Sequence, residues 1–165
     1  MAMGCPPTRP GRGAQGLSLI EVVVVVVLLG ILLALSLGGR SLIDDRRLAG
    51  AARTLVGDLR LVEQRARTER RCWRVTFDPA GEAYTLQFTT DPWDATTGCP
   101  AAGWQSLRAV TLPSRIDLAS TSFAGDTMTV SPFGNPNAGA VVLRTPGGGQ
   151  RRVVVTVGGR VELAP

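Results

Sequence analysis

The residue types in this chain limit the chemistry that it can perform. Its 165 residues include no His, and all 18 basic residues are Arg, so Lys is absent too. The chain therefore lacks Ser-His, Cys-His and Ser-Lys nucleophile pairs and the commonest zinc ligand. Asp91 and Asp94, on either side of Trp93, are typical of loop carboxylates. The sequence predicts a protein that is not an enzyme, with no catalytic residue, no cofactor and no metal site.

One carboxylate occupies an unusual position. Glu21 is the only ionisable residue in an apolar run from Leu17 to Leu37. About 21 residues form a helix roughly 31 Å long, which matches the hydrocarbon thickness of a bilayer. The run is too long for a signal-peptide core or a strand, so it predicts a transmembrane helix over 17–37. A carboxylate there costs about 2.5–3.5 kcal/mol on insertion scales, so a positively charged partner is expected.

A new chain end would supply such a partner. If the chain is cut after Gly16, the α-amine of Leu17 lies four residues before Glu21, about one helical turn away. The dipole of the helix also favours a negative charge at this end. The carboxylate would then neutralise its own amine or that of a neighbouring helix. The alternative is that Glu21 lies at the membrane interface and needs no partner.

The segment from Gly16 to Glu21 resembles the processing site of type IV prepilins and type II secretion pseudopilins. That site has a Gly, an apolar residue, Ser or Thr, two apolar residues and Glu, after a basic leader. The resemblance implies a leader over 1–16 that prepilin peptidase removes after Gly16, N-methylation of Leu17, and Glu21 as the assembly carboxylate. The implied partners are other pilins or pseudopilins in a filament, the inner-membrane assembly platform and membrane lipid. Leu17 departs from the usual Phe.

Arginine counts conflict with the orientation that this motif implies. The leader carries Arg9 and Arg12, whereas arginines at 40, 46, 47 and 53 follow the apolar run. The positive-inside rule alone would place the C-terminal part in the cytoplasm. We give the processing motif more weight. It implies a single-pass protein of the inner (cytoplasmic) membrane, with its head domain in the periplasm or outside the cell, and at the filament tip after assembly.

The rest of the pattern predicts an α+β fold, in which a long N-terminal helix packs on an antiparallel β-sheet head domain. Apolar residues at steps of three and four predict an amphipathic helix over 38–71 that continues into the head. This stripe consists of Leu48, Ala52, Leu55, Leu59, Val62 and Ala66. Gly38-Gly39 is where a separate second helix would begin instead. From Cys72 the apolar period changes to two, which predicts a β-rich head over 72–165.

The strands are expected in order along the head. Alternating residues around an Asp-Pro-Ala-Gly turn predict a hairpin of 73–77 with 84–88. Further strands are expected near 107–112, 127–131, 140–144, 151–157 and 160–163.

Two cysteines of the head form an even pair once Cys5 in the leader is set aside. In an oxidising compartment, a disulfide between Cys72 and Cys99 would close a loop of roughly 28 residues, worth about 3.5 kcal/mol in the chain-entropy model. The alternative is two unpaired, buried thiols.

The head also resembles the GspH/FimT branch of the same family. The resemblance rests on Val130–Pro136, Ala140–Leu143, Arg151–Val155 and Gly159-Arg160. Members of this branch are minor subunits that help to initiate or cap a type IV pilus or a type II secretion pseudopilus, so the chain is expected to be a minor pilin or pseudopilin.

The same resemblance carries an alternative function. Some FimT-like members bind DNA in natural transformation (competence) through arginines near the C-terminus. The candidates here are Arg144, Arg151, Arg152 and Arg160, which would meet phosphates if the strands bring them together. Glu162 argues against this function, because DNA-binding relatives tend to carry a second arginine there.

Overall fold

A computed structural model describes residues 18–164, with the side chains of 35–42 left undescribed. Its single α-helix, α1 (Leu19–Glu69), includes Gly38 and Gly39 without a break in the helical assignment. The chain divides into two compact units, Met1–Gly39 and Arg40–Pro165, and we call the second the head unit.

The first unit exposes its apolar side chains. Every large hydrophobic residue of α1 from Leu19 to Leu33 has at least 49% of its surface exposed. Over the residues that the structure describes, no helical stretch has the length and hydropathy needed to cross a membrane. The expected transmembrane segment 17–37 extends beyond those residues, because Leu17 and the side chains of 35–37 lie outside the description.

The head unit contains two antiparallel sheets of four strands each. The first sheet has the order β3-β2-β1-β5 and the second has the order β4-β6-β7-β8. The strands of the first are β1 (Trp73–Asp78), β2 (Ala83–Thr89), β3 (Trp104–Thr111) and β5 (Thr127–Val130). Those of the second are β4 (Asp117–Thr121), β6 (Gly139–Arg144), β7 (Gln150–Val155) and β8 (Val161–Ala164), with a short 3₁₀ turn, η1 (Ala124–Asp126), before β5.

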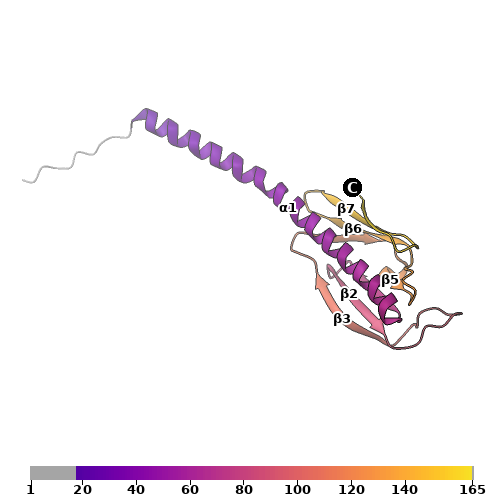
Figure 1. The fold of residues 1–165 in the computed structure, drawn as a ribbon. Helices are drawn as coiled ribbons and strands as arrows, with labels where there is room; N and C mark the ends of the chain where they lie inside the picture. The colour runs from indigo at the N-terminus through magenta and orange to yellow at the C-terminus, as the bar shows by residue number, and fades with distance from the viewer. Residues whose placement is uncertain (1–17, 165) are drawn as a thin grey trace, which may run out of the picture. The chain divides into compact units, whose positions relative to one another are not determined.

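One core joins the helix to both sheets. The six residues of the predicted apolar stripe are each at most 2% exposed. They belong to the same buried cluster as Val75 and Leu86 of the first sheet and Val141 and Val153 of the second. In Figure 1, β2 and β3 are seen on one side of the C-terminal part of α1, and β6 and β7 on the other. Burying each large aliphatic side chain contributes roughly 1.5–3 kcal/mol.

Two buried carboxylates also attach α1 to the rest of the head unit. Asp58 accepts hydrogen bonds from the Tyr84 hydroxyl, at 2.6 Å, and from the Arg108 guanidinium. Asp44 accepts one from Arg115 at 2.8 Å. Both aspartates are at most 8% exposed, so each charge is buried with a partner, as burial requires.

The α+β class is confirmed, and the strand order differs in one respect from expectation. The hairpin of β1 and β2 and the later strands lie close to their predicted positions. β4 was not expected, and the strands form two sheets where a single antiparallel sheet was expected. The register of β4 against β6 shifts between Leu118 and Ser120, and Leu118 is its single buried residue. This bulge interrupts the alternation by which a strand is recognised in a sequence.

Candidate processing and assembly site

The first turn of α1 carries the candidate assembly carboxylate. The Ser18 carbonyl accepts hydrogen bonds from the backbone N–H groups of Glu21, at 2.9 Å, and Val22, at 3.3 Å. Ser18 therefore stands at the N-cap and Glu21 is the third residue of the helix. Ser is favoured at the N-cap. Glu is favoured at the third residue of a helix, where its negative charge lies near the positive end of the helix dipole. Gly16 and Leu17 lie outside the described residues.

The Glu21 carboxylate is available to a partner. Its side chain is exposed, and no hydrogen bond or ion pair holds it among residues 18–164. The Ser-x-x-Glu spacing from Ser18 to Glu21 is a helix-start signal that the sequence analysis did not use. Neither side-chain hydrogen bond of a capping box is present among residues 18–164, so the spacing marks the start of the helix only as a sequence preference.

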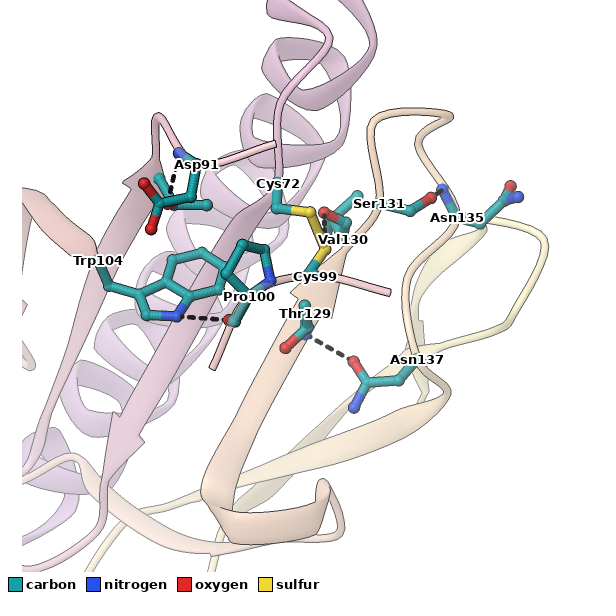
Figure 2. Close-up of a disulfide and its surroundings, with 11 residues drawn as sticks. Cys72, Asp91, Cys99, Pro100, Trp104, Thr129, Val130, Ser131, Asn135 and Asn137 are labelled. Atoms are coloured by element: carbon teal, nitrogen blue, oxygen red, sulfur yellow. Dashed lines mark hydrogen bonds between the residues drawn. A yellow bond between two sulfur atoms is a disulfide. The ribbon is translucent and has the colours of Figure 1, made fainter. Parts of the chain in front are cut away.

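The structure joins the two head cysteines at one end of the first sheet (Figure 2). Cys72 and Cys99 form a disulfide, with a Cα–Cα distance of 5.8 Å. Beside it, the indole N–H of Trp104 donates to the carbonyl of Pro100 at 3.0 Å. Cys99 Sγ lies 3.7 Å from the carbonyl oxygen of Val130 on β5. The long loop between β2 and β3 is thus attached to the sheet through its middle.

Asp94, an acidic residue of that loop, stabilises a turn of the backbone. Asp94 Oδ1 accepts hydrogen bonds from the backbone N–H groups of Thr96, at 2.7 Å, and Thr97, at 2.8 Å. These bonds stabilise the ionised form, so the pKa of Asp94 is lowered. The carboxylate closes a turn, and no group of three or more metal-ligating side chains is found within the described part of the chain.

The second sheet does not bring the four candidate DNA-binding arginines together. Arg151 and Arg152 are neighbours on β7, so their side chains point to opposite faces of the sheet. Arg144 pairs with Gln150 at the start of β7, whereas Arg160 lies beyond its other end. Six residues of strand separate these ends by roughly 17 Å.

Arg160 forms an ion pair with Glu162, two residues further along the chain. Its guanidinium lies 3.2 Å from the Glu162 carboxylate, and both side chains are exposed. Glu162 therefore neutralises part of the candidate surface.

Comparison with known proteins covers most of the chain. A family model described as type II transport protein GspH matches residues 51–159. The chain belongs to the GspH family. A second model, of the prokaryotic N-terminal methylation motif, matches residues 11–37, which include Gly16, Leu17 and Glu21. The resemblance expected from the sequence is confirmed: the chain belongs with the type II transport proteins of the GspH family and carries the N-terminal methylation motif.

Solved structures confirm the pilin-like fold of this GspH family member. The minor pseudopilin EpsH from the type 2 secretion system of Vibrio cholerae is 18% identical, with a TM-score of 0.57, over 72% of this chain and 96% of that one. The type IV minor pilin FimU of Pseudomonas aeruginosa is also 18% identical, with a TM-score of 0.55, over 73% of this chain and 90% of that one. No curated protein matches the chain.

Proposed function

We propose that this chain is a membrane-anchored minor subunit that helps to initiate or cap a type IV pilus or a type II secretion pseudopilus. The observation that carries the proposal is the continuous exposed apolar surface of α1 from Leu19 to Leu33. A soluble monomer rarely leaves such a surface uncovered, so lipid before assembly and neighbouring helices afterwards are the covers proposed here. The N-terminal methylation motif over residues 11–37 supports this assignment.

The proposed maturation begins at the leader. Prepilin peptidase cuts after Gly16, and the exposed amine of Leu17 is methylated. Loss of Arg9 and Arg12 changes the formal net charge from +5 to +5 − 2 = +3. The apolar half of α1 then holds the protein in the inner membrane, with the head unit on the periplasmic side or outside.

Glu21 gives the assembly step its register. In the low dielectric of lipid or of a filament core, an unmatched charge is costly. A carboxylate in the first turn of one helix therefore favours the position at which it meets the Leu17 amine of the adjacent subunit. The apolar side chains around it supply most of the attraction, and the ion pair selects one alignment of the helices.

The test is a Glu21→Gln variant of the full chain in cells that make the other filament subunits. Leaving one partner of a buried ion pair uncompensated costs roughly 3–5 kcal/mol, so recovery of the chain in sheared filaments should fall about tenfold or more. Its level in the membrane should not change. Asp91→Asn, which alters an exposed head carboxylate, is the matched control and should assemble normally. Unimpaired assembly of Glu21→Gln, or an unmethylated N-terminus at Met1, would contradict the proposal.

A further inference from the structure

A groove runs between α1 and the edge strand β8 of the head unit, with a volume of about 580 Å³. Its helix wall carries Arg53, Val56, Gly57 and Arg60, and its strand wall carries Val161 and Leu163. All of these residues belong to the head unit, so the groove is formed by that unit alone.

The groove has open space on its helix wall and exposed apolar surface on its strand wall. A Cβ placed on Gly57 would have no atom within 4 Å, so the helix wall has free space at this point. Opposite it, Leu163 leaves 41% of its surface exposed. An apolar side chain from a partner would therefore find both room and apolar contacts.

The strand wall presents backbone as well as side chains. The Arg60 guanidinium donates to the carbonyl of Val161 at 2.9 Å, so this carbonyl faces the helix. Residues two apart in a strand direct their backbone groups to the same edge. The N–H and C=O of Leu163 consequently face the groove too, and an extended chain could pair with them.

Basic side chains outnumber acidic ones in the lining of the groove, which contains Arg53, Arg60 and Glu162. Arg46, Arg53, Arg60 and Arg67 recur every seven residues along α1, about 10.5 Å apart and nearly on one line of the helix. Arg53 has no acceptor within residues 18–164. The one acid on the strand wall, Glu162, is paired with Arg160. The groove thus lacks a carboxylate for Arg53.

We propose that this groove receives an extended acidic segment of a neighbouring pilin-class subunit. Carboxylates of that segment would meet Arg53 and Arg60, while an apolar side chain between them would fill the space over Gly57. A polypeptide fits better than a nucleic acid, because an extended main chain can pair with the strand edge and an apolar side chain can contact Leu163. The inference rests on the proposed function, since it requires other subunits beside this one.

The test uses the full chain, expressed with the other filament subunits and carrying a photo-crosslinking residue at one position. Gly57 probes the groove, and Gly50 is the matched control, since a side chain there also meets nothing within 4 Å. Val24, in the apolar half of α1, reports assembly independently of the groove. We expect position 57, and not 50, to capture a peptide of another pilin or pseudopilin that contains Asp or Glu, identified by mass spectrometry.

Charge reversal then separates the groove from general attraction. Arg53→Glu should lower the yield at position 57 about fivefold, the effect of roughly 1 kcal/mol at an exposed pair. Arg46 lies on the same line of the helix but outside the groove, so Arg46→Glu should change that yield less than about twofold.

Three results would overturn the inference. Equal losses for Arg46→Glu and Arg53→Glu would show diffuse attraction, with no role for the groove. Capture of nucleic acid, lipid or nothing at 57, while position 24 still captures a subunit, would refute the groove and leave the proposed function standing. Failure of position 24 as well would refute the proposed function, and the groove proposal with it.

Discussion

Glu63 is a buried carboxylate with one oxygen that accepts no hydrogen bond among the described residues. It is 7% exposed, and its Oε1 has no hydrogen-bond partner in the part of the chain that the structure describes. Burial raises the pKa of Glu63, and the nearby charges of Arg67 and Arg60 offset this only in part. The Arg67 guanidinium also donates to the carbonyl of Gly134, at 3.1 Å. The ionised form of Glu63 therefore destabilises the head unit relative to its neutral form.

This raised pKa makes stability depend on pH in a defined direction. Between the unfolded and folded pKa values of Glu63 the native state binds more protons, so stability is lost as the pH rises through the folded value. Glu63→Gln should raise the Tm by a few degrees at about pH 8 and leave it nearly unchanged at about pH 4, where both forms are neutral. Thermal unfolding at a series of pH values measures the difference. Glu162→Gln is the exposed control, and a Tm difference that shrinks as the pH rises would contradict the argument.

Tyr84 and Asp58 form a second buried polar contact, and this one is satisfied. Burial, followed by the bond to Asp58, raises the pKa of Tyr84, so its hydroxyl remains a donor at physiological pH. Tyr84→Phe removes a hydrogen bond to a buried charge and should cost about 1.5–3 kcal/mol in the free energy of unfolding. Urea unfolding measures it. Thr68→Ala, which removes an exposed hydrogen bond to the Gln64 carbonyl, should change stability by less than about 0.5 kcal/mol. Equal effects of the two substitutions would mean that the buried contact adds nothing.

The sequence indicates that Asp44 and Asp58 are buried, but it does not identify their partners. Asp44 lies four residues before Leu48 and Asp58 lies three residues after Leu55, so both fall on the apolar stripe of the helix. That position predicts burial. Their partners could not be predicted, because Arg115 and Arg108 are 71 and 50 residues away and reach the helix only through the strand order.

At the scale of elements, local patterns decided what the sequence could predict. The stripe of α1 and the hairpin of β1 with β2 follow regular periods, and both were predicted near their observed bounds. β4 has a bulge in place of a regular period, and its pairing with β6 joins segments far apart in the chain. The division into two sheets arises because β5 pairs with the distant β1 while β6 pairs with β7, so local reasoning could not predict it either.

The disulfide acts at the same scale, because it joins the end of the helix to the loop between β2 and β3. Cys72 and Cys99 are 27 residues apart, and a closed loop of this length is worth about 3.5 kcal/mol in the chain-entropy model. A Cys72→Ser/Cys99→Ser variant should lose about that free energy of unfolding. Denaturant titration with and without reductant measures it. Reductant should bring the wild-type chain to the stability of the variant and leave the variant unchanged, and an equally stable variant under oxidising conditions would contradict the estimate.

At the scale of the whole molecule, the two units have opposite surface chemistry. The buried hydrophobic residues run from Leu48 to Val161 and all lie in the head unit, whereas the first unit exposes Leu19 to Leu33. The long apolar run and the family motif are local patterns, so both could be recognised in the sequence. The head unit carries its own core, and under the proposed function lipid or other chains cover the first unit.

This contrast predicts that residues 40–164 fold without the first 39. Every residue of the hydrophobic core lies within them, as do the ion pairs of Asp44 and Asp58 and the disulfide. The shortened chain should remain soluble without detergent and unfold in one cooperative transition, whereas the full chain should require detergent. Circular dichroism during heating and size-exclusion chromatography measure both properties. Leu55→Ala in the shortened chain should cost about 2–5 kcal/mol, since that side chain is fully buried against the sheets. A gradual transition that Leu55→Ala does not shift would mean that the first unit is needed to form the core.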